Sequence, residues 1–291
     1  MGRIRPQDVA IAIDYRITVT VFQSEWLREA NSYMTNEEEL IVHVKVDTGM
    51  GRIGVREKEE FISIITYISN HPSMKLEGLF THFATADEKE TTYYEKQHER
   101  FTNVLMWLKE LDVQVPLIHS GNSAAGMRFP DHTFNMFRFG ISLYGLTPSL
   151  EIQDELPIKL KPAFTLKTRI THVKQLPKGE SISYGATYQT KEGEWIGTLP
   201  IGYADGWIRK NSSKGGHVLV KGERVPLVGR ICMDQCMIRL HGPTEVGTIV
   251  TLIGQEGESV ITVDEVARRL ETINYEIVCM IGSRVPRVYV K

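Results

Sequence analysis

The sequence has little cysteine, no excess of charge and no long apolar run, and each absence excludes a class of protein. Its three cysteines, Cys232, Cys236 and Cys279, lack the spacing of a disulfide framework or a zinc finger, so Cys232 and Cys236 are expected in the core and no metal site is predicted. The formal net charge of −2 gives no strong attraction to nucleic acid or a membrane surface. Neither a membrane-spanning run of about 20 apolar residues nor a signal-peptide pattern is present, which favours a cytoplasmic protein.

What is present is a chain of 291 residues with ordinary globular composition, long enough for two domains. In its first half, β-branched runs alternate with amphipathic stretches. Strands are predicted over 18–22, 40–46, 76–82, 115–119 and 136–144, and helices over 24–34, 58–69, 93–111 and 123–127. This alternation indicates βαβ units and a parallel sheet.

After Pro148 the pattern changes to short alternating strands between glycine-rich turns. Strands are predicted over 164–173, 195–201, 217–220, 224–228, 237–240 and 248–253. A single helix is predicted over 262–270, where Thr262 and Glu265 have the spacing of a capping box. We therefore expect an α/β domain over 1–150 and an all-β domain, a small barrel or sandwich, over 151–291.

Polar side chains recur on strands that should be buried. His43, Lys45 and Asp47 alternate with valines on one strand. His82 and His119 end the next two predicted strands, and Arg138 lies between two phenylalanines in the last one. A buried polar row is unfavourable unless its members pair or bind something, and Arg138 in particular needs an acceptor. The alternative is an open edge with one wet face, but the repetition over four strands favours a ligand site at their carboxyl ends.

Two segments have the chemistry of anion binding. Residues 47–52 follow a strand and contain two glycines and Arg52. Asn122–Ser123 open a short helix, and residues 138–141 offer backbone N–H groups. Helix N-termini and glycine turns suit phosphate, but neither segment matches a dinucleotide fingerprint or a P-loop.

These segments resemble motifs of the alanine racemase family. The similar segments run in the family's order along nearly the whole chain: HVKVDTGMGRIG (43–54), THFATAD (81–87), NSAA (122–125), RFGI (138–141), SYGAT (183–187), IGYADG (201–206), GRICMD (229–234) and YEI (275–277). The resemblance implies a TIM-type barrel carrying pyridoxal 5′-phosphate, followed by a β domain. It also implies a head-to-tail homodimer in which each β domain closes the active site of the other subunit.

The resemblance further implies roles around the cofactor. Arg138 would face the pyridine nitrogen, with His82 behind it. The phosphate would be held by Ser123, Gly140, Ile141 and Tyr275. The activity implied is interconversion of L- and D-alanine, which supplies D-alanine for bacterial peptidoglycan.

For the substrate, the resemblance implies that Tyr184, supplied by the partner subunit, is the base on one face. Racemisation removes a proton from one face of the α-carbon and returns one to the other, so two bases are needed. Arg52 and Met233 would meet the substrate carboxylate and the O3′ side of the cofactor, and Lys45 resembles a lysine that is carbamylated in some members and orients the arginine. The motifs also carry Tyr203, similar to a tyrosine at the site entry, and Asp234.

One family motif is missing from these 291 residues: the first-strand segment with the lysine that forms the Schiff base. A barrel of eight βα units takes about 250 residues, whereas about 150 precede the β domain here. We therefore expect an incomplete barrel of about five of eight units, and whether such a chain is active alone is left open. The alternatives are a degenerate, inactive fragment of the fold and a related serine or broad-specificity racemase.

Overall fold

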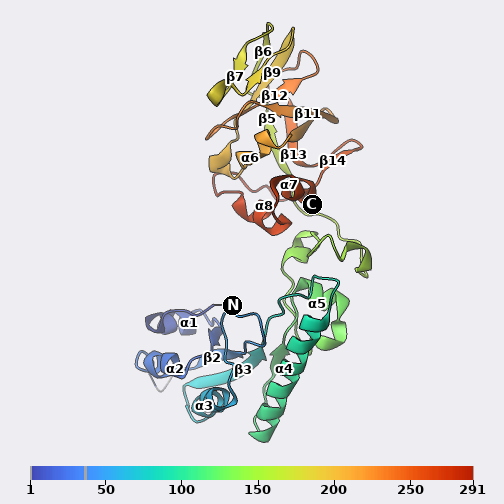
Figure 1. Cartoon of the computed structure of the whole chain (residues 1–291). Coiled ribbons are helices and arrows are strands. Elements are labelled where there is room, and N and C mark those ends of the chain that lie inside the picture. Colours follow the sequence, from blue (N-terminus) through green and yellow to red (C-terminus); the bar gives the residue numbers. More distant parts are fainter. Residues whose placement is uncertain (1, 36–37, 291) are drawn as a thin grey trace. The chain divides into compact units, whose positions relative to one another are not determined.

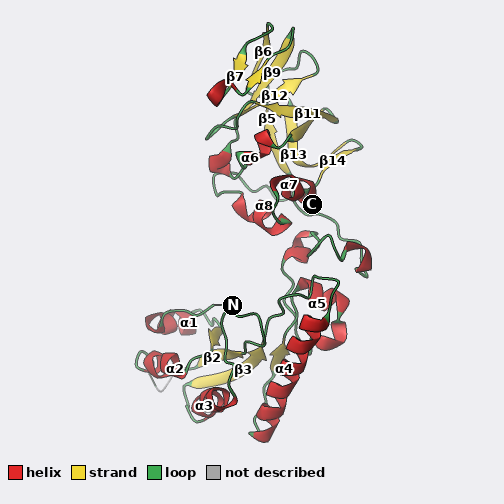
Figure 2. Ribbon diagram, viewed as in Figure 1, coloured by secondary structure: helices red, strands yellow, loops and turns green. Residues whose placement is uncertain are grey.

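The computed structural model describes residues 2–35 and 38–290, which form two compact units. The first unit runs through Leu143 and includes Thr147–Lys159, and the second comprises Tyr144–Leu146 and the chain from Leu160 onward. Figures 1 and 2 show that helices and a small sheet build the first unit, whereas strands dominate the second. No helix in the described ranges is long and apolar enough to cross a membrane.

The first unit contains a four-stranded parallel sheet in the order β1-β2-β3-β4. Its strands are β1 (Val19–Val21), β2 (Leu40–Lys45), β3 (Met74–Phe80) and β4 (Leu117–His119). The helices are α1 (Val9–Asp14), α2 (Ser24–Asn31), α3 (Lys58–Ser69), α4 (Thr92–Glu110) and α5 (Ser123–Arg128), with 3₁₀ turns η1 (Pro6–Asp8), η2 (Pro130–His132), η3 (Ile141–Tyr144) and η4 (Gln153–Glu155). The predicted βαβ units and parallel sheet are confirmed, whereas the incomplete barrel of about five of eight units stays a prediction.

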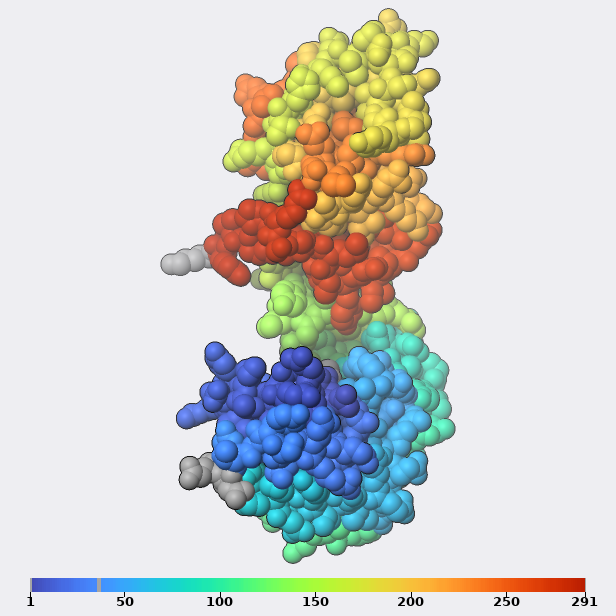
Figure 3. Space-filling view, turned by 90° about the vertical axis from the view of Figure 1, so that its left-hand side faces the viewer, coloured from blue at the N-terminus to red at the C-terminus, as the bar shows by residue number. Residues whose placement is uncertain are grey.

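Apolar periodicity explains the core of this unit. In α3 the buried residues Phe61, Ile64, Ile65 and Ile68 repeat at the spacing of one helical face. They belong to one buried cluster with Val42 and other residues of the strands. The Trp26 indole donates to the Ile4 carbonyl at 2.9 Å and so ties the start of the chain to this unit. Figure 3 shows the N-terminal segment, in dark blue, on the surface of the unit.

The fifth strand predicted over 136–144 is wrong. Met136 makes one isolated parallel bridge with His119, and residues 141–144 form the 3₁₀ turn η3. The amide of Gly140 donates to the Ser123 side chain at 2.9 Å, so a group that a strand ladder would pair is already satisfied. Leu143 is 69% exposed, which shows that the alternating apolar pattern here does not mark a buried face.

The second unit is built on an antiparallel sheet with the path β14-β13-β10-β11-β12-β9-β6, with β5 paired to β13 and β7 to β8. Its strands are β5 (Leu166–Arg169), β6 (His172–Leu176), β7 (Ser181–Ile182), β8 (Tyr188–Gln189), β9 (Glu194–Leu199), β10 (His217–Val220), β11 (Glu223–Val228), β12 (Cys236–Leu240), β13 (Ile249–Glu256) and β14 (Ser259–Ile261). The helices are α6 (Lys210–Ser213), α7 (Val263–Leu270) and α8 (Asn274–Met280), with turns η5 (Tyr184–Ala186) and η6 (Tyr203–Asp205). The expectation of a β-rich second half is confirmed.

Two details of the second half differ from expectation. The run predicted as one strand over 164–173 is two strands, because β5 pairs with β13 and β6 with β9. The helix α7 is followed by a second helix, α8, which was not predicted. No side chain caps the N-terminus of α8. At α7 itself the Thr262 hydroxyl accepts from the Glu265 amide at 2.9 Å, whereas the Glu265 carboxylate pairs with Arg224 instead of closing the capping box.

The cysteines behave as expected for a core role only in part. Cys236 is buried, Cys232 is half-buried and Cys279 is exposed. Among residues 2–35 and 38–290, no cluster of three or more His, Cys, Asp or Glu side chains is placed to hold a metal ion.

Candidate active site

The centre of the candidate site is Arg138, on the loop between η2 and η3. One terminal nitrogen donates to His119 Nδ1 at 2.6 Å. The other donates to the carbonyls of Thr81 and Ser120 and to His82 Nδ1, at 3.0, 3.1 and 3.1 Å. The arginine is therefore held against the carboxyl ends of β3 and β4, and the expectation that it finds an acceptor is confirmed.

Burial and charge tune this cluster. Burial, with a smaller contribution from the charge of Arg52, lowers the pKa of Arg138 to about 10, which still leaves it cationic at neutral pH. Burial and the nearby Arg138 charge lower the pKa of His82 to about 4. His82 is therefore a neutral ring, and its Nδ1 can accept a hydrogen bond from the Arg138 guanidinium.

Lys45 ends β2 and is fully buried. Its Nζ has no hydrogen-bond partner within the described ranges and lies 5.3 Å from the centroid of the Phe80 ring. The Arg138 guanidinium lies 5.4 Å from the same ring. Burial first, and then the charges of Arg52 and Arg138, lower the pKa of Lys45 to about 8. The lysine thus has an unusually accessible neutral form.

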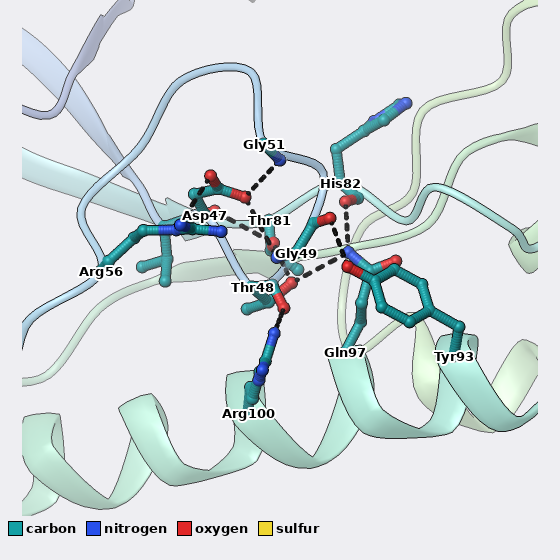
Figure 4. A network of polar contacts seen from close by, with 11 residues as sticks. Asp47, Thr48, Gly49, Gly51, Arg56, Thr81, His82, Tyr93, Gln97 and Arg100 are labelled. Atoms are coloured by element: carbon teal, nitrogen blue, oxygen red, sulfur yellow. Dashed lines mark hydrogen bonds and ion pairs between the residues drawn. The ribbon is translucent and has the colours of Figure 1, made fainter.

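The loop after β2 is folded back on itself by Asp47. One carboxylate oxygen accepts from the amides of Gly49 and Gly51, both at 3.0 Å, and the other lies 3.2 Å from Arg56 Nε. Gly54, at φ +133°, closes the turn; a Cβ there would lie 2.5 Å from the Asp47 nitrogen. Figure 4 shows the compact loop that results.

Helix α4 fastens this loop from below (Figure 4). Tyr93 donates to the Gly49 carbonyl at 2.8 Å, and Arg100 donates to the Thr48 carbonyl at 2.9 Å. Buried Gln97 donates to the His82 carbonyl at 3.1 Å, while the His82 ring points away from the helix. The loop that carries Arg52 and the strand end that carries His82 are therefore held by one helix.

Arg52 projects from this loop and is exposed. Its charge nevertheless contributes to lowering the pKa of Lys45, His82 and Arg138, so it lies within electrostatic range of all three. The structure thus brings together four of the residues singled out from the sequence.

Ser123 joins the start of α5 to the Arg138 loop. Its hydroxyl oxygen accepts from the amide of Gly140 at 2.9 Å and lies 3.5 Å from the amide of Ser142. Asn122 caps the helix by accepting from the Ala125 amide at 3.0 Å. A Cβ added to Gly140 would meet nothing closer than the Ser123 hydroxyl at 3.9 Å, so space is open there, and Ile141 follows as a buried residue.

In the second unit, Tyr184 stands in a turn of unusual backbone conformation. Ser183, Gly185 and Ala186 have φ values of +65°, +74° and +47°. The Ser183 hydroxyl donates to the Arg230 carbonyl, which ties the turn to the 229–234 segment. Tyr184 itself is 69% exposed. A strained, anchored turn that presents an exposed tyrosine is a feature expected of a functional loop.

Tyr203 and Met233 lie on two segments of the second unit that are hydrogen-bonded to each other. The Tyr203 amide donates to the Cys232 carbonyl at 3.1 Å, and the Ala204 amide donates to the Met233 carbonyl at 3.0 Å. Asp234 accepts from Arg284 at 2.6 Å. Tyr275 is the second residue of α8. Tyr203 and Met233 are thus neighbours through their backbones.

Sequence reasoning missed part of the arrangement. His119 was noted only as the end of a strand, His43 only as part of a polar row, and Glu77 not at all. In the structure these three residues connect to Arg138. The signal available was the polar row itself, together with a glycine inside a predicted strand at Gly78.

Comparison with known proteins gives two family matches. The model described as "Alanine racemase, N-terminal domain" matches residues 1–148, and the model "Alanine racemase, C-terminal domain" matches residues 163–289. The chain is 59% identical over 289 residues to the alanine racemase of Halalkalibacterium halodurans, covering 99% of this chain and 74% of that protein. It is 55% identical to that of Geobacillus stearothermophilus, covering 99% and 73%.

Solved structures agree. The crystal structure of alanine racemase from Bacillus anthracis with bound L-Ala-P superposes with a TM-score of 0.96 at 48% identity, over 100% of this chain and 75% of that one. Histidine racemase from Leuconostoc mesenteroides superposes with a TM-score of 0.93 at 30% identity, over 100% and 77%.

Proposed function

The chain belongs to the alanine racemase family, and we propose that its protein interconverts L- and D-alanine with pyridoxal 5′-phosphate. It has the family fold, an α/β unit of the TIM-barrel kind followed by a β domain. The observation that carries the proposal beyond the family is the cation cluster of Lys45, Arg52 and Arg138 at the carboxyl ends of the strands.

This cluster fits an anionic cofactor and substrate. Lys45 and Arg138 form no ion pair within the described ranges, and the nearby Asp47 carboxylate is already engaged by Arg56 and two loop amides. A site with several cations and few matching carboxylates favours anions. The open space beside Gly140 and Ser123 would admit a phosphate, and the family resemblance assigns Ile141 and Tyr275 to the same group.

When bound, the cofactor supplies an electron sink for the charge left on the substrate α-carbon after deprotonation. Arg138 would donate a hydrogen bond to the ring nitrogen, with His82 keeping the guanidinium in place from behind. Because the pKa of Arg138 stays near 10, the arginine keeps its proton at neutral pH, and the ring remains a weaker sink than a protonated one. This would favour simple racemisation over competing bond cleavages.

Tyr184 would hold or deliver the proton on one face of the α-carbon. General-base catalysis requires the phenol oxygen to lie within hydrogen-bond reach of that carbon's proton. The exposed tyrosine on its anchored turn is suited to insertion into a partner's site, so we assign it to the partner subunit of a head-to-tail homodimer. Tyr203 would stand at the entry, and Asp234 would steady the Met233 loop through Arg284.

Arg52 and Met233 would bind the substrate carboxylate, and Lys45 would orient Arg52. Burial among cations makes the neutral amine of Lys45 available at a pKa of about 8, and a neutral amine adds carbon dioxide to give a carbamate and a proton. The resulting negative charge would pair with Arg52. It would thereby give a partner to the buried Lys45 side chain, whose Nζ has no hydrogen-bond partner within 2–35 and 38–290.

The test is a racemisation assay on the protein that carries this sequence, supplied with pyridoxal phosphate. We expect L-alanine and D-alanine each to yield the other, with alanine turned over faster than serine or histidine. Histidine belongs in the panel because one structural neighbour is a histidine racemase. Loaded protein that leaves all three amino acids optically unchanged would contradict the proposal.

A further inference from the structure

A line of three hydrogen bonds leads from Arg138 through two histidines to a carboxylate. Arg138 reaches His119 Nδ1 at 2.6 Å, and His119 Nε2 lies 2.9 Å from His43 Nδ1. His43 Nε2 lies 3.0 Å from Glu77 Oε2, which Thr18 also approaches at 3.1 Å. The line crosses β4, β2 and β3, so it joins three strands of the sheet.

The donors and acceptors of this line can be assigned from chemistry alone. A guanidinium only donates, so His119 Nδ1 must accept, and the proton of the His119 ring is on Nε2. That proton is donated to His43 Nδ1, which leaves the His43 proton on Nε2, donated to Glu77. Every bond therefore points from the cation toward the anion, and both rings are neutral.

The surroundings agree with neutral rings. His119 is buried and stacks on Phe80, with ring centroids 4.7 Å apart and planes 6° apart. Burial and the Arg138 charge lower its pKa to about 3. Burial also lowers the pKa of His43, with Glu77 acting in the opposite sense.

The backbone of β3 is adapted to seat His43. The register between β2 and β3 pairs Val42 with Leu76 and His43 with Gly78, skipping Glu77. Such an irregularity re-aims a side chain. A Cβ on Gly78 would lie 2.6 Å from three atoms of the His43 ring, so the ring lies directly over a position where only glycine fits without displacement.

We propose that Glu77, His43 and His119 form a positioning relay that orients Arg138 and holds its charge in place for the cofactor. Glu77 acts as the remote counter-ion that Arg138 lacks among its own direct contacts. The relay rests on the proposed function only in the assignment of Arg138 to the ring nitrogen. Its geometry is independent of that assignment.

The first test uses the cofactor-free protein and nitrogen-15 NMR of the histidine rings. We expect both His43 and His119 as neutral rings with the proton on Nε2 at pH 7. A proton on Nδ1 of either ring, or a doubly protonated ring, would overturn the relay. This measurement needs no variant and no activity, so a failure of the proposed function does not affect it.

The second test compares Glu77→Gln with Glu110→Gln, the same charge change at an exposed ion pair with Lys58 in the same unit. Glutamine keeps an acceptor oxygen for His43 and loses only the charge. In cofactor-free protein, the Arg138 guanidinium protons should exchange with solvent about tenfold faster in Glu77→Gln. In loaded protein, kcat should fall about tenfold with KM unchanged, as for other residues that orient a directly acting group.

Guanidinium exchange equal in the two variants, or a loss confined to KM, would overturn the relay. Loaded wild-type protein without racemase activity would contradict the proposed function instead, and the exchange and tautomer measurements would still decide the relay.

Discussion

Arg138 Nη1 and His119 Nδ1 lie 2.6 Å apart, and this contact ties a residue of an irregular loop to the end of a β-strand. Because His119 belongs to a strand of the sheet, its hydrogen bond holds the guanidinium in a fixed position, although the backbone of Arg138 is not in regular structure. Precise placement of a donor is what electrostatic catalysis requires.

Arg138→Gln should alter the absorption spectrum of the bound cofactor and lower racemisation by about 10²-fold, because the ring nitrogen loses a charged donor. The measurement is a spectral titration followed by turnover in both directions. Arg28→Gln, which removes an exposed partner of Glu25, is the matched control and should leave both unchanged. An unaltered spectrum and rate in Arg138→Gln would show that the arginine has only a structural role.

Tyr184→Phe should lower racemisation by about 10²–10⁴-fold while cofactor binding is kept, since only the proton-transferring hydroxyl is removed. Tyr188→Phe serves as control, because it removes a nearby hydroxyl that is bonded to Glu194. Exchange of the substrate α-proton with solvent deuterium, started from each enantiomer, gives the readout. Full exchange from both enantiomers in Tyr184→Phe would contradict the assignment.

Lys45 should make the stability of the protein rise with pH. Its pKa is lowered from 10.5 to about 8 in the folded state, so between these values the unfolded chain binds more protons and the unfolding free energy increases with pH. Replacing Lys45 by Met removes this dependence. The variant should exceed the wild type by about 3 kcal/mol below pH 8, in carbon-dioxide-free buffer, with the difference vanishing toward pH 10.5. Urea unfolding at several pH values measures it, and a difference that does not vary with pH would refute the expectation.

Gly78→Ala should destabilise the protein by about 1–3 kcal/mol, because the new methyl group would overlap the His43 ring. The His43 ring is hemmed in by His119 and Glu77, so it cannot move without breaking a hydrogen bond. Gly242→Ala, where nothing lies within 4 Å of an added Cβ, should change stability by less than about 0.5 kcal/mol. Equal midpoints of urea unfolding for the two variants would show that the ring has room to shift.

The fold was most predictable where periodicity is strong and local. The helix over 58–69 and the strand over 217–220 were predicted with the bounds that the structure has. The strand predicted over 136–144 does not form, because its backbone amides bond to groups outside a strand ladder. The Arg138 amide donates to the Gly121 carbonyl, and the Gly140 amide donates to the Ser123 side chain. A period of two indicates a strand only when a neighbouring strand is there to pair with it.

Much of the candidate site was also predictable, because its residues lie in short contiguous motifs. Lys45, Arg52, His82 and Arg138 were singled out from the sequence, and in the structure the charges of the other three contribute to lowering the pKa of His82. The role of Glu77 was not predictable, because a single glutamate in a strand forms no motif and no periodic pattern with its neighbours in the sequence. Its role depends on a register irregularity between β2 and β3.

The sequence by itself determined the order of elements, the two-part organisation and the chemical types gathered at the strand ends, since helical and strand periodicities and motif residues are local properties of the chain. Only the tertiary structure decided that Arg138 lies on a loop and donates a hydrogen bond to His119. It also decided that the pKa of Lys45 falls to about 8 and that Glu77 lies within hydrogen-bond distance of His43. Those outcomes depend on desolvation and on distances between residues 19 to 76 positions apart in the chain, and no local pattern encodes them.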